Sequence, residues 1–140
     1  MIRLLQNKDY EDYVELLRQL TDVGEVTLLQ FCHFVDIRSI NPSIYQTFVY
    51  EIEGKIVGCV TSIIEQKIAH NFRKVMHIED VITHKDYRGK GISTELLNHA
   101  VNFANKSKCY KIILDCSEHN ISFYEKVGFN ISGTQMTIRL

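Results

Sequence analysis

The first forty residues carry apolar side chains at two different spacings. Residues 2–5 (IRLL) form a short apolar run that predicts a strand. Within residues 10–20, apolar side chains recur at helical spacing, which predicts a helix with Asn7 as its cap. Thr27 is expected to cap a second helix, whose apolar face continues through residues 28–40. The chain is therefore predicted to open with a strand and two helices.

The character of the sequence changes at residue 44, where β-branched and aromatic residues become frequent. Residues 44–64 predict two antiparallel strands that are joined by a turn at Glu53 and Gly54. Residues 66–75 are mostly polar and are expected to form a connecting loop. Residues 76–83 (MHIEDVIT) predict the next strand. Three consecutive strands are thus expected in the middle of the chain.

The second half alternates helical and strand patterns. Residues 92–104 place their apolar side chains on one helical face. Residues 110–116 (YKIILDC) are nearly all apolar, which predicts a strand covered on both faces. A short helix is expected around residues 120–129, and residues 134–140 (TQMTIRL) predict a final strand.

The resulting order of elements is β-α-α-β-β-β-α-β-α-β. We therefore predict one α/β (α+β) domain over residues 1–140, with a central mixed, mostly antiparallel sheet flanked by helices. The composition agrees with this class, because 45% of the residues are apolar and 24% are charged.

The charge balance and the cysteines limit the function classes. A formal net charge of −1 argues against nucleic acid as a partner. No apolar run approaches the ~20 residues that span a bilayer, so no membrane association is expected. The four cysteines form no C-x-x-C pair, which favours free thiols in a reducing compartment, the cytoplasm. The spacing of His70, His77 and His84 is not that of a tetrahedral ligand set, so no metal is expected.

A basic turn with two glycines lies between the strand at 76–83 and the helix at 92–104. Backbone amides at a helix start are unpaired and carry the positive end of the helix dipole, and glycines let the backbone wrap closely around an anion. Arg88 and Lys90 add positive charge to Gly89 and Gly91. The turn therefore suits a phosphate or pyrophosphate, although an exposed turn with a helix cap has the same pattern. It lacks the G-x-x-x-x-G-K-[ST] and G-x-G-x-x-G spacings of other phosphate loops.

Acidic residues occur where strands should be apolar. Glu79 and Asp80 are adjacent on a strand, so they point to opposite faces and at least one meets the interior or a cleft. Asp115 ends the next apolar strand. Asn120 and Tyr124 lie four positions apart, on one face of the short helix. Each of these residues has a second interpretation. The pair Glu79 and Asp80 either binds a substrate or forms a structural salt bridge. Asp115 alternatively caps the strand end, and Tyr124 alternatively packs in the core.

Four stretches together resemble a known superfamily. The turn R-x-x-G-x-[small] resembles the acyl-CoA pyrophosphate motif of the GCN5-related N-acetyltransferases, and the order of elements matches. The whole second half is similar to the branch of this superfamily that acetylates glucosamine 6-phosphate, and the first half agrees more loosely through LTDVG and FCHF. Ser93 stands where the superfamily usually has Gly or Ala, which predicts tighter packing. The stretches are HIEDV, YRGKGIS, CYKIILDCSEHNISFYEKVGF and QMTIRL.

The resemblance implies transfer of acetyl from acetyl-CoA to D-glucosamine 6-phosphate, which serves UDP-N-acetylglucosamine synthesis. It implies that Asp115, Tyr124 and the backbone N–H of Val81 act in catalysis. Val81 would polarise the thioester carbonyl, Asp115 would orient the amine, and Tyr124 would donate to the leaving thiolate. The acetyl-CoA site is expected to comprise Val81, Ile82, Thr83, Arg88, Gly89, Lys90, Gly91, Ile92, Ser93, Asn120 and Tyr124.

The resemblance also implies a homodimer in which the sugar site lies near the interface and the last strand takes part. Arg139 would bind the sugar phosphate, because the planar guanidinium matches a phosphate group. Each cationic candidate is equally compatible with a solvated surface position. The residues expected to bind the amino-sugar phosphate are Thr21, Lys67, His70, Glu79, Asp80, Asp115 and Arg139.

Three alternatives remain open from the sequence. The first is an acetyltransferase of the same superfamily that acts on a protein amine or a polyamine. The second is a catalytically silent acyl-CoA-binding sensor, which would keep the glycine turn but could lose Tyr124 or the acids. The third is an interaction module without a ligand, which leaves the acids in apolar strands unexplained.

Overall fold

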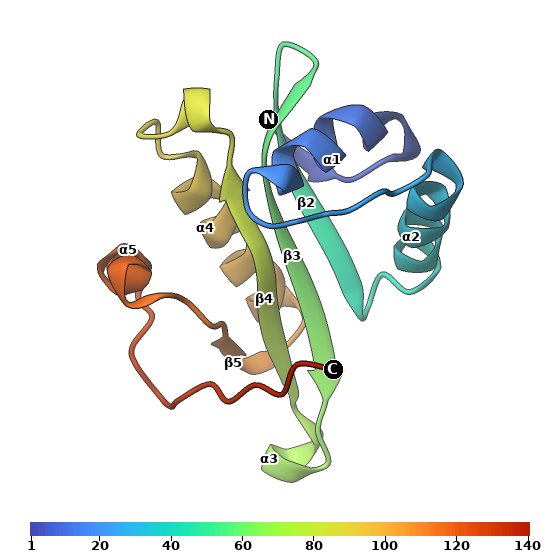
Figure 1. The fold of residues 1–140 in the computed structure, drawn as a ribbon. Coiled ribbons are helices and arrows are strands. Elements are labelled where there is room, and N and C mark those ends of the chain that lie inside the picture. Colours follow the sequence, from blue (N-terminus) through green and yellow to red (C-terminus); the bar gives the residue numbers. More distant parts are fainter.

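A five-stranded sheet in the order β1-β2-β3-β4-β5 forms the centre of the molecule (Figure 1). The computed structural model describes all residues from 1 to 140. Neighbouring strands run antiparallel except β4 and β5, which are parallel. The sheet is therefore mixed and mostly antiparallel, as the sequence predicts. The strands are β1 (Ile2–Leu4), β2 (Tyr45–Ile52), β3 (Lys55–Gln66), β4 (Lys74–Thr83) and β5 (Cys109–Ile113).

Helices cover both faces of this sheet (Figure 1). One face packs against the first two helices, and the other packs against the fourth and the fifth. The helices are α1 (Tyr10–Arg18), α2 (Leu28–Ile40), α3 (Ala69–Phe72), α4 (Ile92–Lys106) and α5 (Ile121–Val127), with 3-10 turns η1 (Asn7–Asp9), η2 (Lys85–Tyr87) and η3 (Glu118–Asn120).

The apolar face predicted for residues 92–104 is the buried face of α4. Ile92, Leu96, Leu97, Ala100 and Ala104 are all buried against β2, β3 and β4. Each buried large apolar side chain contributes about 1.5–3 kcal/mol relative to an exposed one. This packing fixes where α4 starts relative to the end of β4, which matters for the site described below.

The two predicted helix caps have different outcomes. Thr27 caps α2 as predicted: its side chain accepts a hydrogen bond from the Gln30 backbone, and the Gln30 side chain bonds the Thr27 backbone in return. The prediction for Asn7 is wrong, because Asn7 begins the turn η1 and Asp9 is the residue before α1. Asp9 is buried and pairs with Arg3, which ties this turn to β1.

The turn at Glu53 and Gly54 agrees with the prediction, whereas the loop at residues 66–75 differs from it. Glu53 (φ 49°) and Gly54 (φ 81°) both have positive φ, which fits the two-residue turn predicted there. The loop predicted for residues 66–75 is shorter than expected. The strands β3 and β4 extend into it, and its remaining tip contains α3, with left-handed backbone at His70 and Asn71.

The last two predicted strands differ most from the structure. β5 ends at Ile113 and lies at the edge of the sheet, with Lys111 exposed, so the expectation of two covered faces is wrong. The strand predicted at residues 134–140 is absent, because no neighbouring strand accepts its hydrogen bonds within this chain. Figure 1 shows this segment crossing the face of the sheet towards the C-terminus without joining it. No helix of the structure is long and apolar enough to cross a membrane.

Candidate active site at the divergence of β4 and β5

The two parallel strands β4 and β5 separate part of the way along their length. Their pairing runs only from Lys74 opposite Cys109 to His77 opposite Ile113. β4 then continues to Thr83, whereas β5 ends. The edge of β4 from Ile78 onward therefore has no strand beside it on the β5 side. Unpaired strand edges of this kind present backbone N–H and C=O groups to a ligand.

A β-bulge lies within this open part of β4. Cys59 pairs with Ile82 and Thr61 pairs with Glu79, so Asp80 and Val81 together face a single residue of β3. Asp80 adopts a positive φ of 51°, which is uncommon for a residue other than glycine. Bulges are frequent next to active sites because they redirect side chains and end regular pairing.

The glycine turn follows directly at the end of β4. Gly89 (φ 75°) and Gly91 (φ 80°) both have left-handed backbone. A Cβ at either position would meet no atom within 4 Å, so the requirement for glycine is conformational and not steric. Gly91 precedes the first turn of α4 and supplies no side chain to cap its amides. Those amides remain available to an anion.

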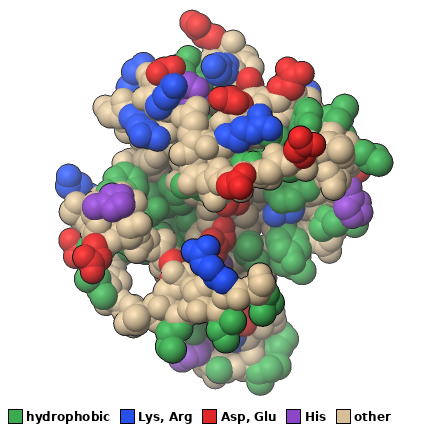
Figure 2. All heavy atoms as spheres, in the orientation of Figure 1, with side chains coloured by type: hydrophobic (Ala, Val, Ile, Leu, Met, Phe, Trp, Pro, Cys, Tyr) green, Lys and Arg blue, Asp and Glu red, His purple; other side chains and the backbone are tan.

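Basic side chains surround this turn. Lys85, Arg88 and Lys90 are all exposed. Figure 2 shows Lys and Arg side chains gathered over the region where β4 leads into α4. Together with the positive end of the α4 dipole, they make this end of the sheet a favourable place for a diphosphate.

Two hydrogen bonds fix the turn relative to the strand. The hydroxyl groups of Thr83 and Ser93 lie 2.6 Å apart, and Arg88 Nε donates to the Thr83 carbonyl oxygen at 3.3 Å. The Ser93 hydroxyl therefore makes a bond that glycine or alanine could not make.

Three carboxylates gather beside the open edge of β4. Burial raises the pKa of Glu79, and the charges of Asp80 and Asp115 raise it further. Burial also raises the pKa of Asp80, against the opposing influence of Thr61 and Arg38. Figure 2 shows acidic side chains within the hollow at the centre of this face. The cluster holds more negative charge than its surroundings neutralise, which suits a cationic ligand.

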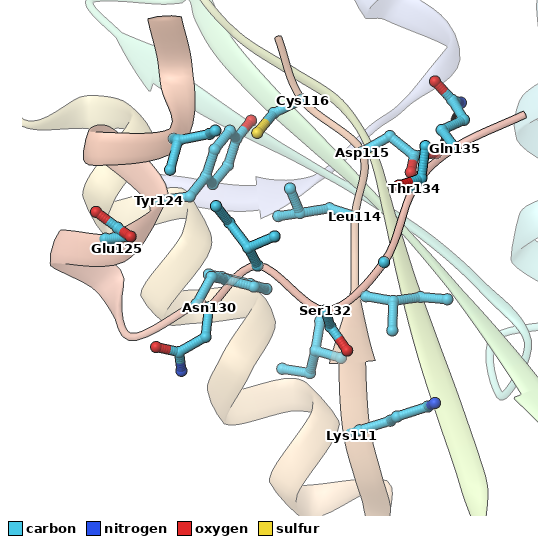
Figure 3. Close-up of a pocket in the computed structure, with 16 residues that line it drawn as sticks. Lys111, Leu114, Asp115, Cys116, Tyr124, Glu125, Asn130, Ser132, Thr134 and Gln135 are labelled. Atoms are coloured by element: carbon cyan, nitrogen blue, oxygen red, sulfur yellow. Dashed lines mark hydrogen bonds between the residues drawn. The ribbon is translucent and has the colours of Figure 1, made fainter. Parts of the chain in front are cut away.

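A cavity of about 440 Å³ lies between β5, α5 and the C-terminal segment (Figure 3). Asp115 and Tyr124 both line it, as does Cys116. Gln135 Nε2 donates a hydrogen bond of 2.9 Å to Asp115 Oδ2, so the C-terminal segment holds this carboxylate. Burial, and then the neighbouring Cys116, raises the pKa of Tyr124, which keeps the phenol protonated.

Other predicted site residues lie elsewhere. Lys67 pairs with Glu65 at 2.6 Å near the tip of the β3–β4 hairpin, and the His70 ring lies tilted against the ring of Tyr110, with 4.4 Å between their centroids. The hairpin tip is separated from Glu79 by roughly 17 Å of strand. One chain therefore does not bring Lys67 or His70 to its own carboxylates.

Three further candidates are exposed without a side-chain partner. Thr21 lies in the connection between α1 and α2, Asn120 ends the turn before α5, and Arg139 is in the C-terminal segment. The structure shows no side-chain contact between them and the three carboxylates.

Gln135 and Cys116 are residues of this site that the sequence analysis missed. The signal for Gln135 was present in the alternation of the last residues: Gln135, Thr137 and Arg139 share one face of an extended chain, opposite Met136 and Ile138. Nothing in the sequence singles out Cys116 beyond its position after Asp115. No group of three or more His, Cys, Asp or Glu residues in the structure is arranged to hold a metal ion.

Comparison with known proteins identifies the family. The sequence model of the acetyltransferase (GNAT) family matches residues 10–129. This chain belongs to that family. The GNAT relatives include glucosamine 6-phosphate N-acetyltransferase of Candida albicans, 37% identical over 98% of this chain and 93% of the relative. The enzyme of the same name from Trypanosoma brucei brucei is 33% identical over 99% of this chain and 95% of its own length.

The solved structures agree with this GNAT assignment. The crystal structure of glucosamine-6-phosphate N-acetyltransferase from Arabidopsis thaliana matches with a TM-score of 0.96 and 34% identity. The match covers 99% of this chain and 97% of that one. The resemblance stated from the sequence is therefore confirmed, in fold and in family.

Proposed function

We propose that this GNAT enzyme transfers acetyl from acetyl-CoA to D-glucosamine 6-phosphate, giving N-acetyl-D-glucosamine 6-phosphate and CoA. The observation that carries the proposal is the geometry of β4. An uncapped glycine turn for a diphosphate lies at one end of its open edge, and three carboxylates for an amine lie along it. The names of the full-length relatives support the amino-sugar phosphate as acceptor.

The diphosphate of acetyl-CoA fits the turn formed by Arg88 to Ser93. The backbone amides at the start of α4 would donate to its oxygens, and Arg88 and Lys90 would add charge. The left-handed conformations of Gly89 and Gly91 bring the backbone around the anion. Ile92 keeps the turn in place through its buried side chain.

The pantetheine arm and the acetyl group would lie along the open edge of β4, where a missing strand leaves room. Val81, Ile82 and Thr83 would bind them through backbone groups. The N–H of Val81, in the bulge, would donate to the thioester carbonyl oxygen as negative charge develops on it. Asn120 would line the far side of the same opening, next to α5.

Acetyl-CoA supplies the acyl group as a reactive thioester. The bound ammonium first loses one proton to give the neutral amine. Its nitrogen then forms a bond to the acetyl carbonyl carbon, the C–S bond breaks, the nitrogen loses a second proton and the thiolate gains one. Positioning provides much of the acceleration in such a reaction. The residues of this chain therefore need to align the amine, remove its proton and stabilise the departing sulfur.

The carboxylates serve the acceptor. Glu79 and Asp80 would bind the ammonium and hydroxyl groups of the sugar, and Asp115 would orient the amine. The raised pKa values of Glu79 and Asp80 make them better proton acceptors than ordinary carboxylates. Gln135 would hold Asp115 in one orientation for this purpose.

Tyr124 serves the leaving group. Its raised pKa keeps the hydroxyl protonated, so it can donate a hydrogen bond to a thiolate. Its place in the same cavity as Asp115 supports this role, because the amine and the sulfur are bonded to the same carbon as the reaction proceeds.

We further propose that the enzyme acts as a homodimer. Met136 and Ile138 are 93% and 87% exposed on the apolar side of the C-terminal segment, and β5 has a free edge beside it. A second copy would cover both. The same arrangement would allow Lys67 and His70 to reach the sugar phosphate of the partner's site, with Thr21 and Arg139 as further phosphate contacts.

The setting is proposed to be the cytoplasm, where the product would serve UDP-N-acetylglucosamine synthesis. All four cysteines are unpaired, and disulfides are rare in that compartment. The net charge of −1 agrees with a small-molecule acceptor and argues against nucleic acid as a partner.

One assay tests the acceptor. Release of free thiol from acetyl-CoA is followed with glucosamine 6-phosphate, glucosamine, a lysine peptide and spermidine. We expect fast release only with the sugar phosphate. Equal rates with and without it would overturn the proposal, and preference for the peptide or for spermidine would replace it with a different GNAT activity. Acetyl-CoA binding without turnover on any acceptor would identify a sensor.

A further inference from the structure

A set of polar side chains is buried behind the bulge of β4, on the face of the sheet that α1 and α2 cover. Tyr13, Thr47, Cys59 and Thr61 are each at most 2% exposed. Apolar residues would fill this space with less loss of hydration, because buried polar groups cost free energy unless they are paired. The reaction as described above uses none of these residues.

Hydrogen bonds connect the two threonines to Arg38 of α2, whereas the Tyr13 hydroxyl has no hydrogen-bond partner. Arg38 Nε donates to Thr47 Oγ1 at 3.3 Å, and Thr47 Oγ1 lies 3.1 Å from Thr61 Oγ1. Thr61 pairs with Glu79 across the sheet, next to Asp80, and its hydroxyl lowers the pKa of the Asp80 carboxyl group. A path of polar contacts thus runs from α2, across β2 and β3, to the bulge of β4.

The donors along this path all point the same way. Arg38 can only donate, so Thr47 accepts from it and its own O–H is free for Thr61. Thr61 then has its O–H free for the carboxylate of Asp80. An ionised carboxylate only accepts hydrogen bonds, so this order favours the charged form of Asp80.

A second contact holds the backbone of the bulge. Cys59 Sγ donates to the carbonyl oxygen of Asp80 at 3.2 Å. Burial raises the pKa of Cys59, which keeps the proton that this bond needs. The bond stabilises the positive φ of Asp80, a conformation that costs of order 1 kcal/mol or more without compensation.

Arg38 is itself held in a fixed position. Its guanidinium carbon lies 3.4 Å from the centre of the Phe34 ring and 5.5 Å from that of Tyr45. Nη1 also donates to the Phe34 carbonyl oxygen at 3.3 Å. A stacked guanidinium keeps its direction, whereas the flexible chain of a lysine does not.

We propose that Arg38 is a positioning residue, which acts through Thr47 and Thr61 to hold the Asp80 carboxylate ionised and directed at the acceptor. The proposal rests on the proposed function for the role of Asp80, but the geometry of the path stands independently of it. It extends the site to α2, a helix that packs on β2.

The electrostatics support this assignment. Burial raises the pKa of Asp80, and both Thr61 and Arg38 oppose the rise. The groups that face Asp80 are Tyr13 from α1, Arg38 from α2, Cys59 from β3 and Glu79 from β4 itself. Arg38 is the cation among them, so its removal leaves the carboxylate without a counter-charge.

The experiment compares Arg38→Met and Thr61→Val with the wild type. We expect KM for the amino-sugar phosphate to rise about 10-fold in both, with KM for acetyl-CoA unchanged. We also expect the acidic limb of the kcat/KM profile to move up by about 1 pH unit. Arg38→Lys keeps the positive charge without the stacked, planar guanidinium and should recover part of the wild-type position of the acidic limb. Thr61→Ser keeps the hydroxyl and should recover most of it.

Carboxyl NMR titration of Asp80 gives a readout that does not depend on turnover. The pKa of Asp80 should be higher in Arg38→Met than in the wild type, even in a protein that acetylates no sugar. Arg18→Met, on the exposed end of α1, is the control and should change neither the titration nor the kinetics. An unchanged Asp80 titration and acidic limb in folded Arg38→Met and Thr61→Val would overturn the proposal. Inactivity of the wild type towards the sugar phosphate would instead overturn the proposed function.

Discussion

The hydroxyl groups of Thr83 and Ser93, 2.6 Å apart, join the last residue of β4 to the first turn of α4. The two residues lie on either side of the glycine turn, so their bond closes the loop that surrounds the candidate diphosphate site. Loss of this bond should therefore weaken coenzyme binding more than it slows the chemical step.

Ser93→Ala tests this connection. The loss of one hydrogen bond costs about 1 kcal/mol, which corresponds to roughly fivefold weaker binding of CoA. Titration calorimetry with CoA measures it, and kcat at saturating acetyl-CoA should change little. Asn98→Ala, on the exposed face of α4, is the control. Unaltered CoA affinity in Ser93→Ala would show that the turn keeps its shape without this bond.

Gly91→Ala tests the left-handed conformation in the turn. A side chain at φ 80° costs about 1–2 kcal/mol of stability, although it would meet no other atom. We expect CoA affinity to fall at least 10-fold as well. Gly54→Ala, at φ 81° in the β2–β3 turn, is a matched control: chemical denaturation should show a similar loss of stability, with no loss of CoA binding. Equal CoA affinities for the two variants would contradict a role for the turn in binding.

Tyr124→Phe tests the protonation of the leaving thiolate. Removal of the hydroxyl should lower kcat about 100-fold, with little change in CoA affinity. Pre-steady-state thiol release gives the rate of the chemical step directly. Tyr50→Phe, on β2, controls for the loss of a phenol elsewhere. Full turnover in Tyr124→Phe would remove the proposed role and leave the binding assignments intact.

The raised pKa of Asp80 predicts a pH-dependent conflict between stability and activity. The folded state holds this proton more tightly than the unfolded chain, so the stability of the wild type falls as pH rises from the unfolded pKa near ~4 through the folded pKa. Asp80→Asn should therefore be about 1 kcal/mol more stable at pH 7 and lose activity. Urea unfolding at several pH values should show the two proteins converging below about pH 4. A constant difference at all pH values would contradict this origin of the effect.

Ile138→Asp tests the proposed homodimer. A charge in the apolar side of the C-terminal segment should convert a dimer into a monomer and lower activity at least 10-fold, because a buried unpaired charge is costly. Light scattering after size-exclusion chromatography reports the mass. Leu29→Asp, at an exposed position of α2, is the control. A wild-type protein that is monomeric at all concentrations would contradict the proposed assembly.

The elements that sequence reasoning predicted well are those whose signal lies within a short stretch of sequence. The cap at Thr27 and the turn at Glu53 and Gly54 depend on contacts within a few residues, and the apolar face of α4 is visible in the local helical spacing of its residues even though it packs against distant strands. The C-terminal segment has the alternation of a strand, but a strand also needs a neighbour, and sequence pattern cannot supply one. The turn at η1 likewise depends on the pairing of Asp9 with Arg3.

The same distinction applies to the candidate site. Residues of the glycine turn lie together because they are consecutive, so the sequence was sufficient to group them. The proximity of Asp115 to Glu79 follows from the parallel pairing of β4 with β5. The contact of Gln135 with Asp115 joins residues 20 positions apart, and no local rule indicates it. The same is true of the path from Arg38 to Asp80.

The excess negative charge around Glu79 has a consequence for turnover. In the reaction we propose, an ammonium group is attracted into a cluster of carboxylates. Acetylation replaces that group with a neutral amide, for which the cluster has no electrostatic attraction. The chemical step thus weakens the binding of the sugar that it has just modified, and product release needs no separate conformational trigger.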